Sequence, residues 1–397
     1  MKVAGAHLTY CTNIHPGETW DEIRANLERY LPLVKERASP DAPFGVGLRL
    51  SAVAAHSLAE PAVLADFKAF LAAQELYVFT INGFPYGPFH GTRVKDDVYR
   101  PDWRDPARLD YTNRLAELLA QLLPPGFDGP GSISTVPGAF KAHATAPEAV
   151  PLIVEQLLRH AAHLASLERA TGRCIVLALE PEPCCLLETV DETVRFFQRH
   201  LHSAAAAARL AELAGLDVAA AATALRRHLG VCLDLCHAAV EFEEPVACVQ
   251  ALGTAGITIA KVQVTAGLRI PLVTEGVLDE LRRYEDAVYL HQVVERGPAG
   301  LQRYADLADA RTAGHWRNNA CEWRVHFHVP VFLDTLDPFA STQAFARDVL
   351  AQQRQQTFAT QLEVETYTWS VLPPQHRTAQ VEDAIARELA WVRGCLA

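Results

Sequence analysis

The sequence predicts an α/β protein built as a (β/α)8 barrel, on three observations. Short apolar runs alternate with longer segments whose apolar residues recur every three or four positions. This repeated order of strand and helix is typical of a parallel sheet with helices outside it. The chain has 397 residues, half of them apolar, which is enough for the core of such a barrel. No linker rich in Gly, Ser or Pro divides it, so we expect one domain over residues 1–397.

Nine segments have the length and apolar content of strands, one more than the barrel needs. They are Val3–Tyr10, Phe44–Leu50, Tyr77–Ile81, Gly131–Thr135, Cys174–Leu179, Gly230–Leu235, Ile257–Val264, Arg324–Val331 and Gln361–Thr366. The surplus lies between Ile257 and Val331. There we expect the seventh strand to be followed by an inserted antiparallel piece that involves Tyr289–Val294 or Arg324–Val331.

The helical segments between these strands have apolar residues at three- and four-residue spacing. We expect helices at Trp20–Lys35, Pro61–Gln74, Leu109–Leu123, Pro147–Ala170, Phe339–Thr357 and Ala379–Arg393. Thr189 and Glu192 form a capping-box pattern, which predicts a helix running to His200. Residues Ala204–His228 predict one or two alanine-rich helices, an insertion after the fifth strand.

Charge and cysteine content argue against several classes of protein. Lys and Arg number 36 against 47 Asp and Glu, a formal net charge of −11; without a basic block, the chain is a poor nucleic-acid binder. No signal-peptide pattern opens the sequence and no run of 18 apolar residues occurs, so we expect a cytoplasmic protein without a membrane span. Nine cysteines, an odd number in a large chain, do not suit a disulfide framework.

Acids follow the fifth and sixth strands, where a parallel barrel forms its active site. Glu180 comes directly after the fifth strand, with Glu182 on the same face. Asp234 ends the sixth strand, and His237 follows three residues later. Buried carboxylates are costly unless they are paired or bind a cation. The alternatives are a Glu at the barrel rim, an Asp that caps the next helix and a buried structural His.

The last strand and the insertion add more such side chains. Glu363 and Glu365 share one face of the last strand, an alternation that a half-exposed edge strand would also show. His326 and His328 share one face of the inserted segment, and two neighbouring imidazoles suit a transition metal. The seventh strand offers Gln263, a hydrogen-bonding group and a poor metal ligand.

The first strands contribute polar loops, each a weak signal alone. Arg49, at the end of the second strand, could bind an anion. The loop after the third strand has Asn82, Tyr86 and His90, with aromatic neighbours that suit a sugar-sized pocket. Asn13 follows the first strand. Taken together, acids from separate strands plus histidines predict a divalent cation site with oxygen and nitrogen ligands.

Two resemblances extend this interpretation. The xylose-isomerase-like TIM barrels, which include sugar epimerases, inosose dehydratases and endonuclease IV, have metal-binding strand ends that resemble ALEPEP, CLDLCHA and LEVETYTW. More narrowly, the chain resembles the EboE family of metabolite traffic proteins. Segments spread from Asn82 to Pro373 show that likeness: INGFPYGPFHG, VKDDVYRPDW, SISTVPGAFK, HFHVPVF and LEVETYTWSVLP.

The broader resemblance implies metal ligands. In the ketose 3-epimerases of that superfamily, a Glu, an Asp, a His and a Glu from strands 5 to 8 hold one divalent metal. The matching positions are Glu180, with Glu182 as a rival, then Asp234, and finally Glu365 or Glu363.

The same resemblance gives His237 a contact with substrate. It also exposes a departure, because Gln263 stands where the His ligand is expected. We expect His326 or His328 to replace it from the inserted strand.

The expected function is therefore a metal-assisted isomerase or epimerase of a sugar, cyclitol or related polyol, with Mn, Mg, Co, Fe or Zn. Glu180 and Glu365 would lie on opposite faces of the substrate and remove and return a proton, and His237 would contact it. One alternative is a cyclitol dehydratase or lyase that uses the same groups. Another is a non-catalytic protein that binds or hands over a metabolite. A nucleic-acid partner is not expected, and the oligomeric state, a homo-oligomer included, stays open.

Overall fold

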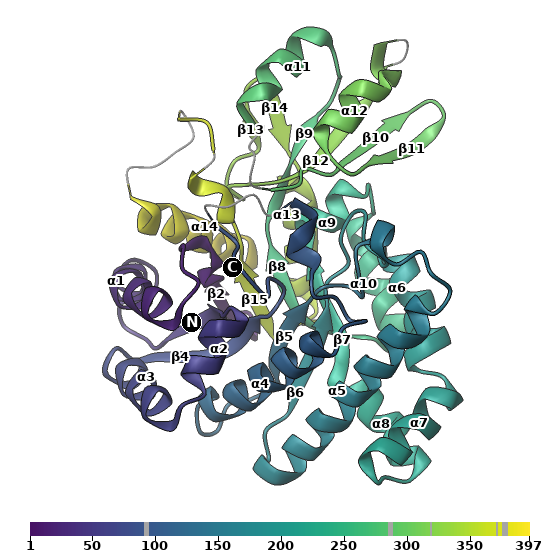
Figure 1. The fold of residues 1–397 in the computed structure, drawn as a ribbon. Helices are drawn as coiled ribbons and strands as arrows, with labels where there is room; N and C mark the ends of the chain where they lie inside the picture. The colour runs from purple at the N-terminus through teal and green to yellow at the C-terminus, as the bar shows by residue number, and fades with distance from the viewer. Residues whose placement is uncertain (91–94, 285–288, 318–319, 371, 375–379) are drawn as a thin grey trace.

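The computed structural model describes residues 1–90, 95–284, 289–317, 320–370, 372–374 and 380–397. Of the expected element boundaries, Ala379 lies outside them. The chain forms a barrel ringed by helices, with a smaller sheet above one end (Figure 1).

The barrel is a nine-stranded sheet that contains the eight expected parallel strands. In spatial order they are β1 (Lys2–Val3), β2 (Ala6–Tyr10), β15 (Gln361–Val364), β8 (Thr258–Val264), β7 (Leu229–Asp234), β6 (Ile175–Leu179), β5 (Gly131–Thr135), β4 (Leu76–Asn82) and β3 (Phe44–Arg49). Only β1 pairs antiparallel, with β2. The sheet closes between β2 and β3, where Cys11 bridges to Gly47. Burial on both faces explains why these strands are continuous apolar runs.

Helices follow the strands around the barrel, as the sequence predicts. They are α1 (Trp20–Ala38), α2 (Ala52–Leu58), α3 (Pro61–Ala73), α4 (Pro106–Leu122), α5 (Ala149–Thr171), α6 (Val190–Phe196), α7 (Ala204–Ala214), α8 (Val218–His228), α9 (Leu235–Val240), α10 (Pro245–Thr254), α13 (Gln343–Gln355) and α14 (Val381–Leu396). The alanine-rich insertion after the fifth barrel strand is α7 and α8, broken at Gly215 in the left-handed region.

Two helix predictions need correction. The helix expected at Phe339–Thr357 begins only at Gln343, because Phe339–Ser341 forms a strand that pairs with the inserted sheet. The helix that follows Thr189 changes to a π-helix at Phe197–Leu201. Thr189 caps this helix through its hydroxyl.

The insertion after β8 forms a second, antiparallel sheet of six strands. In spatial order they are β11 (Gly300–Tyr304), β10 (Val293–Gly297), β12 (Glu322–Val329), β9 (Ala266–Ile270), β14 (Phe339–Ser341) and β13 (Thr335–Leu336), with α11 (Glu275–Leu281) and α12 (Leu307–Ala313) beside them. The predicted piece at Arg324–Val331 lies largely in β12, and Tyr289–Val294 reaches β10 with its last two residues. Because β9 follows β8 after one residue, this sheet rises from the carboxyl end of the barrel (Figure 1).

A buried ion pair lies inside the barrel. Lys261 of β8 and Glu363 of β15 are both buried and form a salt bridge, and the ammonium also donates to Thr80 Oγ1 at 3.2 Å. Gly47 makes room for the carboxylate: a Cβ there would lie 1.9 Å from Glu363 Oε1 and 2.7 Å from the Tyr10 carbonyl oxygen. Backbone and carboxylate therefore require glycine at this position.

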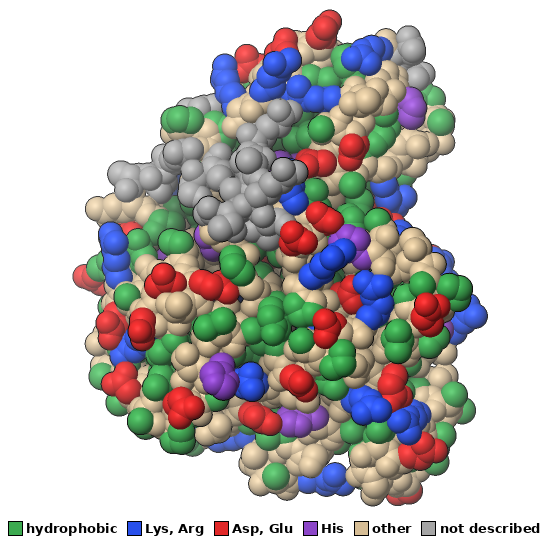
Figure 2. Space-filling model, in the orientation of Figure 1, with side chains coloured by type: hydrophobic (Ala, Val, Ile, Leu, Met, Phe, Trp, Pro, Cys, Tyr) green, Lys and Arg blue, Asp and Glu red, His purple; other side chains and the backbone are tan. Residues whose placement is uncertain are grey.

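On the face shown in Figure 2, the described acidic and basic side chains are interspersed. None of the helices in the described ranges is long and apolar enough to cross a membrane. All nine cysteines are free, as their number predicts.

Candidate metal centre

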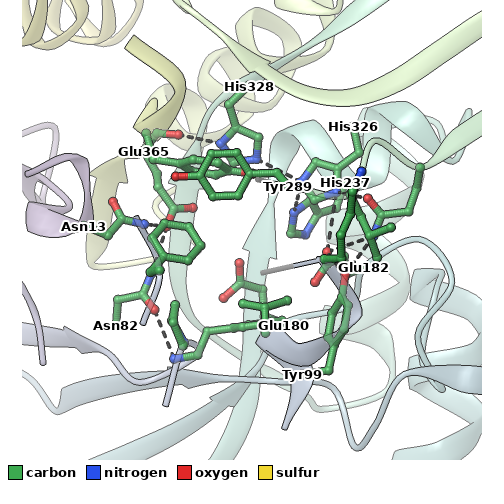
Figure 3. Close-up of a pocket in the computed structure, with 18 residues that line it drawn as sticks. Asn13, Asn82, Tyr99, Glu180, Glu182, His237, Tyr289, His326, His328 and Glu365 are labelled. Carbon is green, nitrogen blue, oxygen red and sulfur yellow. Dashed lines mark hydrogen bonds and ion pairs between the residues drawn. The ribbon is translucent and has the colours of Figure 1, made fainter. Parts of the chain in front are cut away.

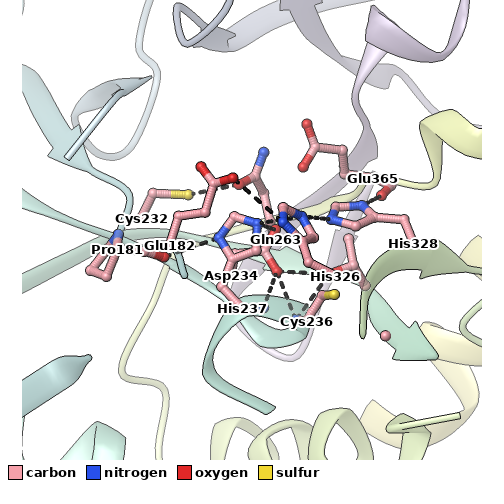
Figure 4. Close-up of polar contacts among 12 residues, drawn as sticks. Pro181, Glu182, Cys232, Asp234, Cys236, His237, Gln263, His326, His328 and Glu365 are labelled. Atoms are coloured by element: carbon pink, nitrogen blue, oxygen red, sulfur yellow. Dashed lines mark hydrogen bonds and ion pairs between the residues drawn. The ribbon is translucent and has the colours of Figure 1, made fainter. Parts of the chain in front are cut away.

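A pocket opens at the carboxyl ends of the barrel strands, below the inserted sheet (Figure 3). Its polar side chains come from the ends of β2, β4, β6 and β15, from α9 and from the inserted strand β12. They are Asn13, Asn82, Glu180, Glu182, His237, Gln292, His326, His328 and Glu365, with Lys95 among the remaining, mostly apolar, lining residues. Asp234 lies directly behind this group (Figure 4).

Three imidazoles, those of His237, His326 and His328, lie in this pocket. In each ring, an oxygen acceptor next to Nδ1 determines which nitrogen carries the hydrogen. The Nδ1 of His237 lies 3.0 Å from the Pro181 carbonyl oxygen. The Nδ1 of His328 lies 2.6 Å from the Glu365 carbonyl oxygen. A carbonyl oxygen only accepts, so each Nδ1 must donate its hydrogen and each Nε2 must hold a lone pair.

The third imidazole has the same tautomer for a related reason. His326 Nδ1 lies 2.9 Å from Gln292 Oε1. The Gln292 amide is oriented by its nitrogen, which donates to the Pro183 carbonyl and to Tyr99 Oη. Its oxygen therefore faces His326 and takes the Nδ1 proton, which leaves the Nε2 lone pair free.

The His326 lone pair lies close to each of the other two (Figure 4). His326 Nε2 lies 3.1 Å from His237 Nε2 and 3.2 Å from His328 Nε2. Neutral rings with protonated Nδ1 atoms have no hydrogen to place between these nitrogens. Two ligands at about 2.1 Å from one ion lie about 3.0–3.4 Å apart, so the spacing fits a shared cation. The bonds from each Nδ1 to an oxygen are those that hold metal-binding imidazoles in place.

Three carboxylates lie next to the imidazoles. Glu180, Asp234 and Glu365 offer oxygens that all lie within 4.8 Å of one another. Glu180 Oε2 and Asp234 Oδ2 are buried, and neither has a hydrogen-bond partner among the described residues. Like charges this close repel, and burial away from water adds to the cost. Burial first, then the neighbouring carboxylates, raise the pKa values of Glu180 and Glu365 well above the usual range.

Asp234 connects the two sets of ligands. Its Oδ1 caps α9 by accepting from the backbone N–H groups of Cys236 and His237 at 2.7 and 3.1 Å, and it also accepts from Thr265 Oγ1. Its Oδ2 lies 3.8 Å from His237 Nε2. The helix cap and the metal ligand were alternatives in the sequence. In the structure one oxygen makes the helix cap, and the other takes no part in it and faces the imidazole.

Glu365 and Glu182 are held on opposite sides of the pocket (Figure 3). Glu365 Oε1 accepts from Asn13 Nδ2 at 2.6 Å and from Asn82 Nδ2 at 2.8 Å. Glu182 Oε1 accepts from Tyr99 Oη at 2.6 Å. Burial raises the pKa of Glu182 to about 8, although Tyr99 and a neighbouring amide oppose this shift.

The strand geometry explains why both inserted histidines reach the pocket. His326 and His328 are two apart in β12 and so point to the same side. A register shift in the pairing with β9 falls between Val325 and His328. Burial lowers the pKa of both imidazoles, so both stay neutral at pH 7, the form in which imidazole binds metal.

The structure thus brings together eight of the predicted site residues: Asn82, Glu180, Glu182, Asp234, His237, His326, His328 and Glu365. In the described part of the chain, these atoms fit a divalent cation by ligand type, convergence and unsatisfied lone pairs.

Three residues expected to contact substrate do not line this pocket. The Arg49 guanidinium donates to the carbonyls of Gly17 and Gly87, so it holds two loops together. Tyr86 packs edge-on against Tyr111 at 5.1 Å. His90 lines a separate hollow on the outer side of that loop. Tyr86 and His90 are turned away from the strand ends by their loop, whereas Arg49 ends β3 and is held by these loop carbonyls.

Two more residues that were expected to contact substrate, Gln263 and Glu363, lie inside the barrel, one layer of side chains below the pocket. Cys232 Sγ donates to Gln263 Oε1 at 3.1 Å inside the barrel, and Glu363 is paired with Lys261. Side chains two apart in a strand share a face at successive depths. Glu365 therefore reaches the pocket where Glu363 does not.

Several lining residues were missed by sequence reasoning. Gln292 and Tyr99 orient His326 and Glu182. Tyr99 falls in the quoted segment VKDDVYRPDW, whereas no sequence pattern marks Gln292. Phe89, Tyr289 and Tyr367 close the pocket from three separate loops. Phe89 and Tyr367 fall in the aromatic segments quoted above, which was a usable signal.

Neither a protein-family model nor a curated protein matches this sequence. Among solved structures, a xylose isomerase-like TIM barrel protein from Mycobacterium smegmatis, solved in complex with magnesium, is 13% identical with a TM-score of 0.52, covering 100% of this chain and 98% of that chain. The chain has a xylose-isomerase-like TIM-barrel fold.

Two other solved structures cover nearly the whole chain, with TM-scores below 0.5. The probable 3-DHS dehydratase AsbF from Bacillus anthracis is 13% identical with a TM-score of 0.47 and coverage of 97% of each chain. The IolI protein, solved with a zinc atom, is 12% identical with a TM-score of 0.47 and coverage of 98% of each chain.

Proposed function

We propose that this chain is a metal-dependent enzyme that moves a proton on a sugar, cyclitol or related polyol, as an isomerase or epimerase. The observation that supports it most is the meeting of three imidazole Nε2 lone pairs whose Nδ1 protons are all given to oxygen acceptors. The unpartnered oxygens of Glu180 and Asp234 support the same proposal.

Two neighbouring ligand groups would hold the cation. One is Glu182, His237 and His326; the other is Glu180, Asp234 and Glu365. A third group, Asp234, His237 and His328, shares one residue with each of them. A divalent cation here would polarise a carbonyl or hydroxyl oxygen of the substrate. Imidazole and carboxylate together suit Mn, Fe, Co or Zn, and carboxylates alone suit Mg.

The chain's own residues would then supply proton transfer and orientation. Glu180 and Glu365 face the pocket from different strands, so they approach a substrate from different sides. The Asn13 and Asn82 amides fix Glu365 at one oxygen and leave the other for the substrate or the cation. A carboxylate positioned next to a C–H bond beside a carbonyl takes and returns its proton. His237 would contact the substrate oxygens.

The proposal includes the expected biological role, the cellular location and the alternative activities. The likeness to the EboE family suggests a role in making or trafficking a small metabolite, in the cytoplasm, by one domain and without nucleic acid. A dehydratase or lyase would use the same acids, and its product would have lost water. A handover protein would bind the metabolite and leave its C–H bonds intact.

The first test is the metal content of the purified, tag-free protein, with and without added Mn or Mg. About one or more equivalents per chain are expected, and His326→Gln and Glu180→Gln should each lower that number. His56→Gln and Glu60→Gln, both exposed on other faces, are the matched controls. A protein that holds no metal under either condition would overturn the proposal.

The second test separates catalysis from handover. The protein is incubated in deuterated water with a panel of ketoses and cyclitol ketones, and deuterium at the carbon next to the carbonyl is measured. An isomerase or epimerase exchanges that hydrogen with solvent. Binding without exchange for every bound compound would favour the handover protein.

A further inference from the structure

Three aromatic rings cover the candidate metal centre. The ring centroids of Phe89 and Tyr289 lie 5.3 Å apart, those of Phe89 and Tyr367 5.2 Å, and those of Tyr289 and Tyr367 5.1 Å. The three rings come from the loop after β4, the insertion and the segment after β15. We call Phe89, Tyr289 and Tyr367 the aromatic roof. Its rings line the same pocket as the carboxylates of Glu180, Glu182 and Glu365 and the imidazoles, which we call the polar floor. Figure 3 shows Tyr289 above this floor.

The space between roof and floor is small. Its volume is about 60 Å³, whereas pockets that hold small molecules measure about 300–1,000 Å³. Apolar side chains such as Phe84, Val98 and Leu290 continue the wall beside the roof. A ring-sized substrate must therefore push between the aromatic rings and the floor, and one of its faces will lie against aromatic carbon.

The charged side chains among the described lining residues are mostly acidic. Among the described lining residues, Lys95 is the single Lys or Arg, and its ammonium is paired with Asp306 Oδ2 at 2.7 Å. The floor holds Glu180, Glu182 and Glu365. A phosphate would meet these carboxylates, and the described lining residues include no Arg to offer the fork that recognises phosphate.

We propose that the substrate carries its metal-facing oxygens on a flat apolar or aromatic group and has no phosphate. This inference rests on the proposed function, because the floor is taken to bind vicinal oxygens. The roof supplies the other half of recognition, since aromatic faces pack well against flat apolar surfaces. Among the polyols of the proposed function, one that carries such a group offers the roof more flat apolar surface than a free sugar or cyclitol, which offers only its C–H faces.

The test uses three probes with one shared hydroxyketone group. They are 2-hydroxyacetophenone, which has an aromatic ring, hydroxyacetone, which has none, and dihydroxyacetone phosphate, which has a charge. Calorimetric titration of the Mn-loaded protein should give the aromatic probe the tightest binding, by about ten-fold or more over hydroxyacetone. The phosphorylated probe should bind no better than hydroxyacetone.

Variants locate the effect at the roof. Phe89→Ala should weaken the aromatic probe about five-fold or more and leave hydroxyacetone unchanged. Phe89→Leu keeps an apolar side chain without a ring, so its affinity for the aromatic probe should lie between those of the parent and Phe89→Ala. Phe70→Ala, which removes a half-buried ring on α3 far from the pocket, is the control and should change neither probe.

The outcomes separate this inference from the proposed function. Tightest binding of the phosphorylated probe, or equal loss of all probes in Phe89→Ala, would overturn the inference while metal content still supports the enzyme. The protein could instead hold no metal and still bind the aromatic probe most tightly, in a way that depends on Phe89. That result would support the role of the aromatic roof and contradict the proposed metal-dependent enzyme.

Discussion

His237 Nε2 lies 3.1 Å from His326 Nε2, and neither nitrogen has a hydrogen to share. Their Nδ1 protons are given to the Pro181 carbonyl and to Gln292 Oε1. Two lone pairs at this distance repel unless a cation or an added proton lies between them. Burial lowers the pKa of both imidazoles well below the usual value, so added protons are disfavoured at neutral pH. The arrangement is therefore suited to a metal cation.

The first prediction concerns stability and follows from this repulsion. A cation that binds only the folded state stabilises it by mass action, by about 4 kcal/mol at a thousand times its Kd. We expect the chelated protein to gain several degrees in Tm when Mn or Zn is added. The gain should shrink strongly in His326→Gln. An equal gain in both proteins would mean that the metal binds elsewhere.

The second prediction concerns protons released on metal uptake. Burial and neighbouring carboxylates raise the pKa values of Glu180 and Glu365 well above the usual range, and burial raises that of Glu182 to about 8. A raised carboxyl pKa means that protons stay bound at a pH where ordinary carboxylates have lost them. A cation must displace these protons, so metal affinity should rise with pH up to about 8.

Calorimetry in two buffers of different ionisation enthalpy counts the released protons. We expect a positive number at pH 7, and a smaller one in Glu182→Gln. Since the imidazoles are already neutral, they should contribute none. Metal binding that is independent of pH between 6 and 8 would contradict the assignment.

A third prediction concerns a buried carboxyl outside the pocket. Glu388 of α14 accepts from the Val331 N–H at 3.0 Å and from Thr366 Oγ1 at 2.7 Å, and burial raises its pKa to about 7. Because the folded-state pKa lies above the ordinary 4.5, its contribution to stability is complete below pH 4.5 and is lost as pH rises to about 7.

Glu388→Gln removes this titration and keeps an oxygen acceptor. We expect the variant to lose less free energy of unfolding than the parent between pH 5 and 7, by an amount on the order of 2 kcal/mol. Urea unfolding at several pH values measures it. If the free energy of unfolding changed with pH equally in the parent and the variant, the raised pKa of Glu388 would be refuted.

The fourth prediction concerns the ion pair inside the barrel. Lys261→Met leaves Glu363 buried without its partner, and such removals cost about 3–5 kcal/mol. The double variant Lys261→Met with Glu363→Leu should recover part of that loss, because neither charge remains. Denaturant unfolding of the two variants tests this. If Lys261→Met were as stable as the parent, water or another group would have to reach the Glu363 carboxylate.

The strand ends were the most predictable part of the site. A buried apolar run that stops at Glu180 or Asp234 locates a strand and its carboxyl end at once, and parallel topology brings such ends to one mouth. Residues on loops were less predictable. Tyr86 and His90 have suitable chemistry, but the loop backbone turns them away from the pocket, and no periodicity specifies loop direction. Arg49 ends β3, yet two loop carbonyls bind its guanidinium outside the pocket.

The inserted sheet shows the same limit at larger scale. The sequence marked His326 and His328 as a pair on one face and placed them in an antiparallel insertion. Which barrel groups they would meet depends on how β12 pairs with β9, a contact between residues about 55 positions apart. Gln292 and Tyr99, which set the His326 tautomer and the Glu182 environment, come from two further segments. Tyr99 lies in a segment quoted for the family likeness, and no pattern marked Gln292.

The sequence by itself determined the barrel, its helices, its two insertions and the acids at the strand ends, because these follow from local periodicity and from one topological rule. Only the tertiary structure decided which side chain of each pair reaches the pocket, which imidazole nitrogens hold lone pairs and what covers the site. Those properties depend on contacts between residues distant in the chain, and a shift of one residue in a strand would exchange its two faces.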